Sequence, residues 1–260
     1  MNKAWETVKL ARHSKRPRAC DYIEKICEEF IELHGDRCYR DDKAIITGIG
    51  KIDKYAVTIV AEQKGKTTKE NLERNFGMPN PEGYRKALRA MKQAEKFERP
   101  IITFIDTPGA FCGIDAEERG AGEAIARNLL EMSRLKVPII CIIIGEGSSG
   151  GALAIAVGDK ILMLENSIYG VLSPEGFASI LWKDAKKASK AAEIMKITAT
   201  DLKNLNLIDK IIKEKNGGAH ESLEETAKEI KKEIIINLKI LTKINKKQLI
   251  ENRYKKYKNM

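Results

Sequence analysis

Two apolar runs, at residues 101–105 and 137–144, each lead into a loop and then into a segment with helical character. The first run is IITFI, followed by DTPGAFCG and an amphipathic stretch at 115–135; the second is VPIICIII, followed by GEGSSGG and ALAIAV. Runs that are apolar on both faces and alternate with helices are typical of a parallel sheet covered on both sides. The sequence therefore predicts an α/β fold, whose ligands bind at the carboxyl ends of the strands.

Other segments add elements before and after this unit. Apolar residues at helical spacing predict a helix over 19–34 that ends at Gly35, and a later helix with Asn80 as its N-cap and Pro81 as its first residue. The remaining predictions are strands at 44–52, 55–61 and 160–164, helices near 174–182, 184–195, 200–206 and 222–242, a short segment at 208–212, and a charged tail that frays at its end.

Composition excludes several classes of protein. The 260 residues are 43% hydrophobic, which is enough for a folded core, and 47 Lys and Arg against 37 Asp and Glu give a net charge of +10. Residues 213–260 alone hold 13 basic and 7 acidic residues, so the excess only weakly indicates an acidic partner. No apolar run approaches the length of a membrane span, and the charged N-terminus lacks the apolar core of a secretory signal. We expect a cytoplasmic protein.

The five cysteines, at positions 20, 27, 38, 112 and 141, form no C-x-x-C pair and have no nearby pair of histidines. Neither a disulfide framework nor a zinc site is indicated, so we expect reduced thiols and no bound metal.

The loop Gly145–Gly151 holds four glycines in seven residues where a predicted strand meets a predicted helix. Unpaired N–H groups and the helix dipole favour an anion at such a position. The simpler alternative is a tight turn that lets the small residues after it pack close to the sheet. Four glycines exceed what one turn needs, which favours the binding site.

Three chemistries compete for this loop. A P-loop is excluded because Gly151 and Ala152 stand where the lysine and the hydroxyl residue belong. A serine hydrolase is the second, since Gly147, Ser149 and Gly151 match G-x-S-x-G and Asp209 and His220 follow in the order of that class; His220 is also explained as an ordinary loop residue.

The third chemistry uses the backbone. The N–H groups of Gly150 and Gly151 are predicted to form an oxyanion hole for an enolate or a similar anion. Glycine then serves the approach of a flat substrate, so Gly151→Val is expected to abolish activity and to leave the fold assembled.

A series of motifs resembles one family in order along the chain. It includes WETVKLARH, GDR, QKG, RNFGMP, PEGYRKALR, PIITFIDTPGA, AEERG, EAIARNL, IGEG, SGGALAI, SPEG, LIDKII and GGAH, and covers roughly residues 5–220. The family is that of the alpha subunits of bacterial acetyl-CoA carboxylase carboxyltransferase, members of the crotonase-like superfamily. Phe111 and Cys112 depart from its usual Tyr-Pro, and Ser148 from its usual glycine.

The resemblance implies a crotonase-like (ClpP/crotonase) fold of repeated β-β-α units with flanking helices. It implies an N-terminal helical segment at 1–40, a carboxyltransferase domain at 41–220 and a C-terminal charged helix and tail at 221–260. It also implies transfer of a carboxyl group from carboxybiotin to acetyl-CoA, giving malonyl-CoA for fatty acid biosynthesis. The catalytic groups would be the N–H groups of Gly150 and Gly151; the expected substrate-binding residues are Gly77, Met78, Gly109, Ala110, Gly147 and Ser149.

The same resemblance implies the partners. Biotin arrives on a biotin carboxyl carrier protein and is not bound covalently to this chain. A zinc-containing beta subunit supplies the second anion site in an alpha2 beta2 heterotetramer, and ATP is used by a separate biotin carboxylase. Neither a membrane nor nucleic acid is required.

Arginine usage gives a separate indication. Of the 13 arginines, 12 lie at or before residue 134, in the part of the chain that carries most of the motifs. Forked guanidinium contacts to carboxylates or phosphates are a reason to keep arginine there. The candidates are Arg74, Arg85, Arg89 and Arg119, with ordinary surface ion pairs as the alternative.

Overall fold

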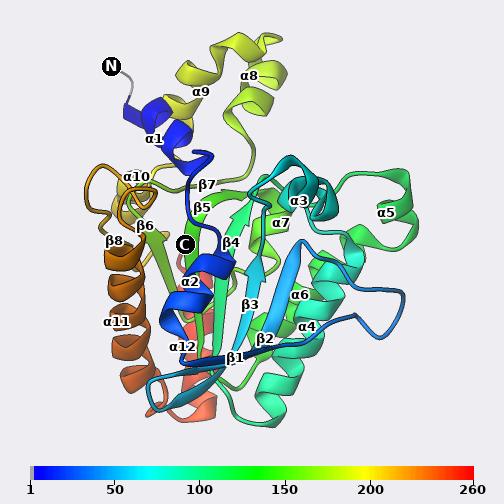
Figure 1. Cartoon of the computed structure of the whole chain (residues 1–260), viewed down its shortest axis with the longest axis vertical. Helices are drawn as coiled ribbons and strands as arrows, with labels where there is room; N and C mark the ends of the chain where they lie inside the picture. Colours follow the sequence, from blue (N-terminus) through cyan, green and yellow to red (C-terminus); the bar gives the residue numbers. More distant parts are fainter. Residues whose placement is uncertain (1–2) are drawn as a thin grey trace.

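A computed structural model describes residues 3–260 and shows an eight-stranded sheet between two layers of helices (Figure 1). Along the chain the strands are β1 (Glu29–Glu32), β2 (Ile45–Ile52), β3 (Tyr55–Glu62), β4 (Ile101–Thr107), β5 (Ile139–Ser148), β6 (Lys160–Leu164), β7 (Ile168–Gly170) and β8 (Lys210–Ile212). Across the sheet their order is β1-β2-β3-β4-β5-β6-β8, with β7 paired to the end of β5. The first two pairings are antiparallel and the others are parallel, so the predicted α/β class is confirmed.

The helices divide between the two faces of the sheet and a projection beyond its edge. They are α1 (Lys3–Ala11), α2 (Ala19–Ile26), α3 (Thr68–Glu73), α4 (Pro81–Lys96), α5 (Ile114–Glu118), α6 (Ala121–Arg134), α7 (Ser149–Leu153), α8 (Pro174–Trp182), α9 (Ala188–Met195), α10 (Ala199–Asn204), α11 (Leu223–Leu241) and α12 (Lys246–Lys258), with 3-10 turns η1 (Asn75–Gly77) and η2 (Ala185–Lys187). Helices α2 and α11 pack on one face, and α4, α6 and α10 on the other. Helices α1, α8 and α9 project together from the top of the molecule (Figure 1).

Strand β5 explains why the apolar run is uninterrupted. Ile140 and Ile142 belong to the core under α2 and α11, whereas Ile139, Cys141 and Ile143 belong to the core under α4 and α6. All five are fully buried. Burying one such side chain contributes about 1.5–3 kcal/mol, so this strand is held from both sides and fixes the position of the loop that follows it.

The predicted helix over 19–34 is wrong in its second half. Helix α2 ends at Ile26, and Cys27 is extended, with φ −86° and ψ 138°. Residues 29–32 then form β1, which pairs antiparallel with β2. The open edge of β2 satisfies the backbone hydrogen-bonding groups of this segment, which outweighs its helical spacing. Gly35 therefore lies in the loop after an edge strand, with φ +75°.

Two elements near the glycine loops also differ from expectation. Gly120 has a left-handed φ of 83° and separates α5 from α6, so 115–135 is not one helix. Strand β5 continues through the predicted loop to Ser148, and α7 begins at Ser149 and ends at Leu153. The segment ALAIAV is therefore mostly not helical.

The C-terminal tail is ordered and does not fray, contrary to expectation. Residues 246–258 form α12, in which Leu249 and Arg253 are buried. The Arg253 guanidinium pairs with Asp159 at 2.8 Å and donates to the carbonyl oxygens of Met132, Leu135 and Val137. Strand β1 joins the sheet and α11 packs on it, so both terminal segments contribute to the core; the domain division at residues 40 and 220 stays a prediction.

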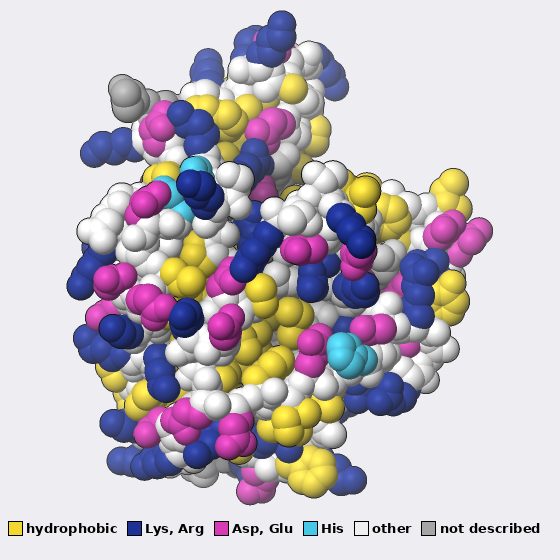
Figure 2. Space-filling model, in the orientation of Figure 1, with side chains coloured by type: hydrophobic (Ala, Val, Ile, Leu, Met, Phe, Trp, Pro, Cys, Tyr) yellow, Lys and Arg dark blue, Asp and Glu magenta, His cyan; other side chains and the backbone are white. Residues whose placement is uncertain are grey.

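Charges of both signs alternate over the face of the molecule drawn in Figure 2. Lys and Arg side chains are spread over the visible face and mixed with Asp and Glu (Figure 2). Within residues 3–260, no helix combines the length and apolar character needed to span a membrane.

Candidate active site

The site is built around a bulge between β4 and β5. The two strands run in register until Ile105 lies opposite Ile143, and Thr107 then lies opposite Gly147. Residues 144–146 of β5 therefore stand against the single residue Asp106 of β4. A bulge interrupts the ladder, bends the strand and leaves backbone groups that need other partners.

Side chains supply those partners. Arg16 Nε donates to the Ile144 carbonyl oxygen at 2.8 Å, and Asp106 Oδ1 accepts the Glu146 N–H at 3.0 Å. A Cβ on Gly145 would lie 2.4 Å from Asp106 Oδ1. Glycine is therefore required at 145, because the carboxylate occupies the place of a side chain.

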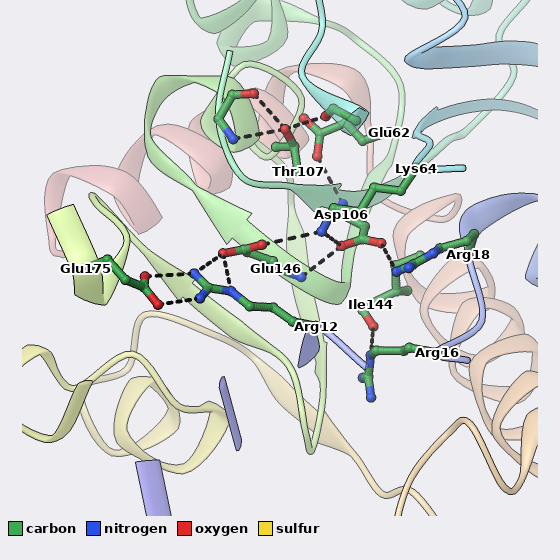
Figure 3. Close-up of polar contacts among 12 residues, drawn as sticks. Arg12, Arg16, Arg18, Glu62, Lys64, Asp106, Thr107, Ile144, Glu146 and Glu175 are labelled. Carbon is green, nitrogen blue, oxygen red and sulfur yellow. Dashed lines mark hydrogen bonds and ion pairs between the residues drawn. The ribbon is translucent and has the colours of Figure 1, made fainter. Parts of the chain in front are cut away.

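Asp106 belongs to a chain of alternating charges, which we call the buried ion network (Figure 3). Its six members are Arg12, Arg18, Lys64, Asp106, Glu146 and Glu175. Lys64 Nζ lies 2.7 Å from Asp106 and 3.5 Å from Glu146. Arg12 lies 2.6 Å from Glu146 and 2.8 Å from Glu175 at the start of α8.

The network contains three cations and three carboxylates, so its charges balance. Burial alone would raise the pKa of Asp106, but Lys64 and Arg18 outweigh burial and lower that pKa. Burial likewise opposes the charge of Arg12, and Glu175 and Glu146 raise its pKa. Removing the Asp106 carboxylate would leave the buried Arg18 guanidinium without its ion-pair partner.

The turn at 75–79 is tied to the loop after β4. Thr107 Oγ1 lies 2.6 Å from the Gly77 carbonyl oxygen and accepts the Gly109 N–H at 3.1 Å. The Phe111 N–H donates to the Pro79 carbonyl oxygen at 3.0 Å. Gly77 has φ +76°, and the next residue, Met78, is half-buried. The structure thus brings two predicted segments together.

The third predicted segment packs directly on the second. A Cβ on Gly151 would lie 2.4 Å from Ala110 N and 2.5 Å from the carbonyl carbon of Gly109. At Gly150 the same atom would meet only Ile125, at an ordinary 3.6 Å. This contact counts against the expectation that Gly151→Val spares the fold, because a side chain at 151 would force the two loops apart.

The backbone at Gly109 borders open space. Gly109 has φ +148°, and a Cβ there would meet nothing within 4 Å. The first turn of α7 leaves the N–H groups of Gly150 and Gly151 without acceptors inside the helix. Unpaired N–H donors at the start of a helix suit an anionic oxygen. Gly147, by contrast, is buried inside β5, where its missing Cβ makes room for Tyr169.

The alternative serine hydrolase is not assembled. Ser149 is exposed at the start of α7, with φ +59°. The His220 ring lies against the His13 ring, 4.2 Å between centroids, and the Asp209 carboxylate accepts the Ile161 N–H and pairs with Lys256. No hydrogen bond or ion pair joins these three residues to one another within 3–260.

The four candidate arginines have partners inside the chain. Arg85 pairs with buried Asp36 at 2.8 Å, and Arg119 pairs with buried Glu82 at 3.2 Å. Arg74 donates to the Lys43 carbonyl oxygen, and Arg89 donates to the carbonyl oxygens of His34 and Gly35. All four therefore have structural contacts within the chain. The arginines of the buried ion network were not among the candidates.

Comparison with solved structures identifies the fold of this chain, and comparison with known sequences then identifies its family. The chain superposes on the transcarboxylase 12S core, whose structure has methylmalonyl-coenzyme A bound, with a TM-score of 0.73 and 17% identity over 94% of this chain and 45% of that one. A malonate decarboxylase hetero-dimer from Pseudomonas superposes with a TM-score of 0.67 and 14% identity, over 85% of this chain and 88% of the other. The chain spans less than half of the transcarboxylase chain. The fold is thus the crotonase-like fold of carboxyltransferases, as expected.

The family follows from sequence. The model of the acetyl co-enzyme A carboxylase carboxyltransferase-like family matches residues 2–260, and the chain belongs to this family. An acetyl-coenzyme A carboxylase carboxyl transferase subunit alpha from Clostridium perfringens is 62% identical over 257 residues, which cover 99% of this chain and 95% of the relative. The subunit of the same name from Halalkalibacterium halodurans is 60% identical over 258 residues, which cover 99% of this chain and 79% of the relative.

Proposed function

We propose that this chain is the alpha subunit of a carboxyltransferase that moves a carboxyl group from carboxybiotin to acetyl-CoA and so forms malonyl-CoA for fatty acid biosynthesis. The observation that carries the proposal is the convergence of three backbone segments, at Gly77, Gly109–Ala110 and Gly150–Gly151, beside open space. Acyl-CoA carboxylation builds negative charge on an oxygen, and fixed N–H donors stabilise such charge.

In this proposal each segment has a role. Gly150 and Gly151 donate backbone hydrogen bonds to the developing anion. Gly109 leaves room for the substrate, and Ala110 holds the rim of the site against Gly151. The turn at Gly77 and Met78 contacts the loop of Gly109 and supports the substrate site. We also assign Gly147 and Ser149 to this site.

The partners follow from the relatives and from the chemistry. The reaction forms two anions in turn, the biotin ureate and the acetyl-CoA enolate, and one backbone hole serves one of them. We assign the other hole to a beta subunit that carries zinc, in an alpha2 beta2 complex. The name subunit alpha of the relatives and the malonate decarboxylase hetero-dimer support a two-chain site.

Carboxybiotin is a substrate delivered on a carrier protein in this scheme, so this chain needs no covalent cofactor. A biotin carboxylase regenerates the carboxybiotin with ATP, and the cytoplasm is the expected compartment. This chain orients one of the two substrates through the backbone groups above.

The test is reconstitution. The purified chain and a beta subunit are mixed with acetyl-CoA and carboxybiotinylated carrier protein, and malonyl-CoA is measured by chromatography. Malonyl-CoA that forms only when both chains are present supports the proposal. A complete complex that forms none overturns it.

A further inference from the structure

Glu62 is a buried acid that the proposed reaction does not use. It is the last residue of β3 and is 0% exposed. Its Oε2 accepts the Asp106 N–H at 3.0 Å, and its Oε1 has no hydrogen-bond partner in the described part of the chain. It forms no ion pair with any of the residues 3–260. An ionised carboxylate in that position would lack compensation.

The groups around Glu62 oppose a second negative charge. Asp106 on β4 is ionised. The two cations next to Asp106 already have carboxylate partners: Lys64 pairs with Asp106 and Glu146, and Arg18 pairs with Asp106. The other titratable groups nearby are the hydroxyls of Tyr84 on α4 and Tyr169 on β7. Burial, and then the charge of Asp106, raise the pKa of Glu62 well above its ordinary value.

The position of Glu62 gives the neutral acid a task. The Asp106 N–H lies in the bulge, where β4 and β5 lose their ladder. The loop that follows carries Gly109 and Ala110, and Tyr84 packs beneath Ala110 with its own buried hydroxyl unpartnered among the described residues. A neutral acceptor at Glu62 therefore holds the backbone at Asp106, where the loop of Gly109 and Ala110 begins. It adds no charge to the buried ion network.

We propose that Glu62 is a positioning residue for carboxyl transfer: as an uncharged acid it anchors the Asp106 N–H and thereby sets the loop of Gly109 and Ala110 against Gly151. The inference rests on the proposed function for its kinetic part. The uncharged state of Glu62 does not depend on that function and is tested separately by infrared spectroscopy.

The kinetic experiment uses the complete alpha–beta complex with three forms of this chain: wild type, Glu62→Gln and Glu62→Leu. Glutamine offers a neutral acceptor of the same shape, so it should keep kcat within about twofold and should keep the wild-type pH profile. Leucine leaves the Asp106 N–H without an acceptor and lets the loop shift, which should lower kcat by about 100-fold with KM for acetyl-CoA nearly unchanged. A purely packing role predicts instead that leucine is tolerated.

Two kinetic results would overturn the inference. Wild-type kcat in Glu62→Leu would show that the anchor is unnecessary. A loss in Glu62→Gln as large as in Glu62→Leu would show that the ionised carboxylate is required. If Glu62→Leu does not fold, the glutamine arm and the spectroscopic arm still decide.

The spectroscopic arm is an infrared difference spectrum of this chain, wild type minus Glu62→Gln, near neutral pH. The carbonyl stretch of a protonated carboxylic acid should appear in wild type and vanish in the variant. Its absence would refute the uncharged state whatever the complex catalyses. A wild-type complex without carboxyl transfer would instead refute the proposed function and the kinetic role together, while the band would still report the charge of Glu62.

Discussion

The carboxylate of Asp106 accepts the backbone N–H of Glu146 at 3.0 Å, across the bulge where β4 and β5 leave their common register. The strand that leads to Gly109 is therefore joined to the strand that leads to Gly151 by a side chain, where a ladder bond would ordinarily lie. Lys64 and Arg18 fix that side chain in turn. The relative position of the two glycine loops depends on buried charges as much as on the sheet.

Replacing Gly151 by alanine should damage the site more than the same change at Gly150. The new Cβ at 151 would lie 2.4 Å from Ala110 N, so the two loops must separate, at a cost of about 1–3 kcal/mol in stability. Alanine keeps the backbone N–H, but moving this donor out of its place should lower kcat by about 100-fold. Gly150→Ala, whose Cβ meets Ile125 at 3.6 Å, should lose less than about tenfold. Malonyl-CoA formation and thermal unfolding check both variants, and a worse result for Gly150→Ala would contradict this arrangement.

Ser149→Ala should retain most of the activity. The side chain is exposed and lies apart from His220 and Asp209, so it contributes at most a loop-ordering effect of about 1 kcal/mol, or about fivefold in rate. A serine hydrolase would instead lose all activity with this change. Labelling of wild type by a fluorophosphonate probe is the companion measurement, and stoichiometric modification of Ser149 would count against the backbone mechanism.

Much of the fold was predictable because its signals are local. The apolar run of β5, buried on both faces, and the Asn80-Pro81 start of α4 both appear where the sequence indicates them. Strand β1 was missed because its pairing with β2 is not local and competes with helical spacing. Helix α12 was missed because Arg253 gains its partners, Asp159 and three carbonyl groups, only in the folded chain.

The candidate site remains a prediction, but part of its geometry was predictable from the sequence. Gly109, Ala110 and Gly151 do converge, but the reason for glycine at 151 depends on a contact between loops that spacing does not reveal. The buried ion network was missed, although one signal existed: two apolar runs are each followed within two residues by an acid, at Asp106 and Glu146. Their cations come from residues 12–18 and from Lys64, which only the fold brings together.

Acid should weaken the fold through Glu214. Burial alone would raise the pKa of Glu214, but fully buried Arg16 and backbone N–H groups outweigh burial and lower it below 4.5. A carboxylate with a lowered pKa in the folded state contributes stability that is complete above the unfolded value and is lost as pH falls through the folded value. The free energy of unfolding, measured with urea, should therefore decrease as the pH is lowered beneath about 4.5.

Glu214→Gln is the control for this prediction. It should lower the free energy of unfolding near neutral pH by roughly 3–5 kcal/mol, because Arg16 is left unpaired, and the difference from wild type should shrink as pH falls. A difference that stays constant with pH would show that the ion pair is not the cause.

Arg253→Met should destabilise the fold although it lies near the C-terminus. The change removes a guanidinium that is 1% exposed and leaves Asp159 and three carbonyl groups without their donor. The expected loss is roughly 3–5 kcal/mol. Thermal unfolding beside the exposed matched variant Lys247→Met checks it, and equal midpoints would mean that α12 is not anchored by Arg253.

The most direct test of the central claim, that backbone donors on this chain complete a two-chain carboxyltransferase, is malonyl-CoA formation by four samples: this chain alone, the beta subunit alone, the wild-type pair, and the pair with Gly151→Ala. Acetyl-CoA and carboxybiotinylated carrier protein are supplied to each. We expect product from the wild-type pair, about 100-fold less from the Gly151→Ala pair, and none from either chain alone. Turnover by this chain alone, or an undiminished rate in the Gly151→Ala pair, would contradict the claim.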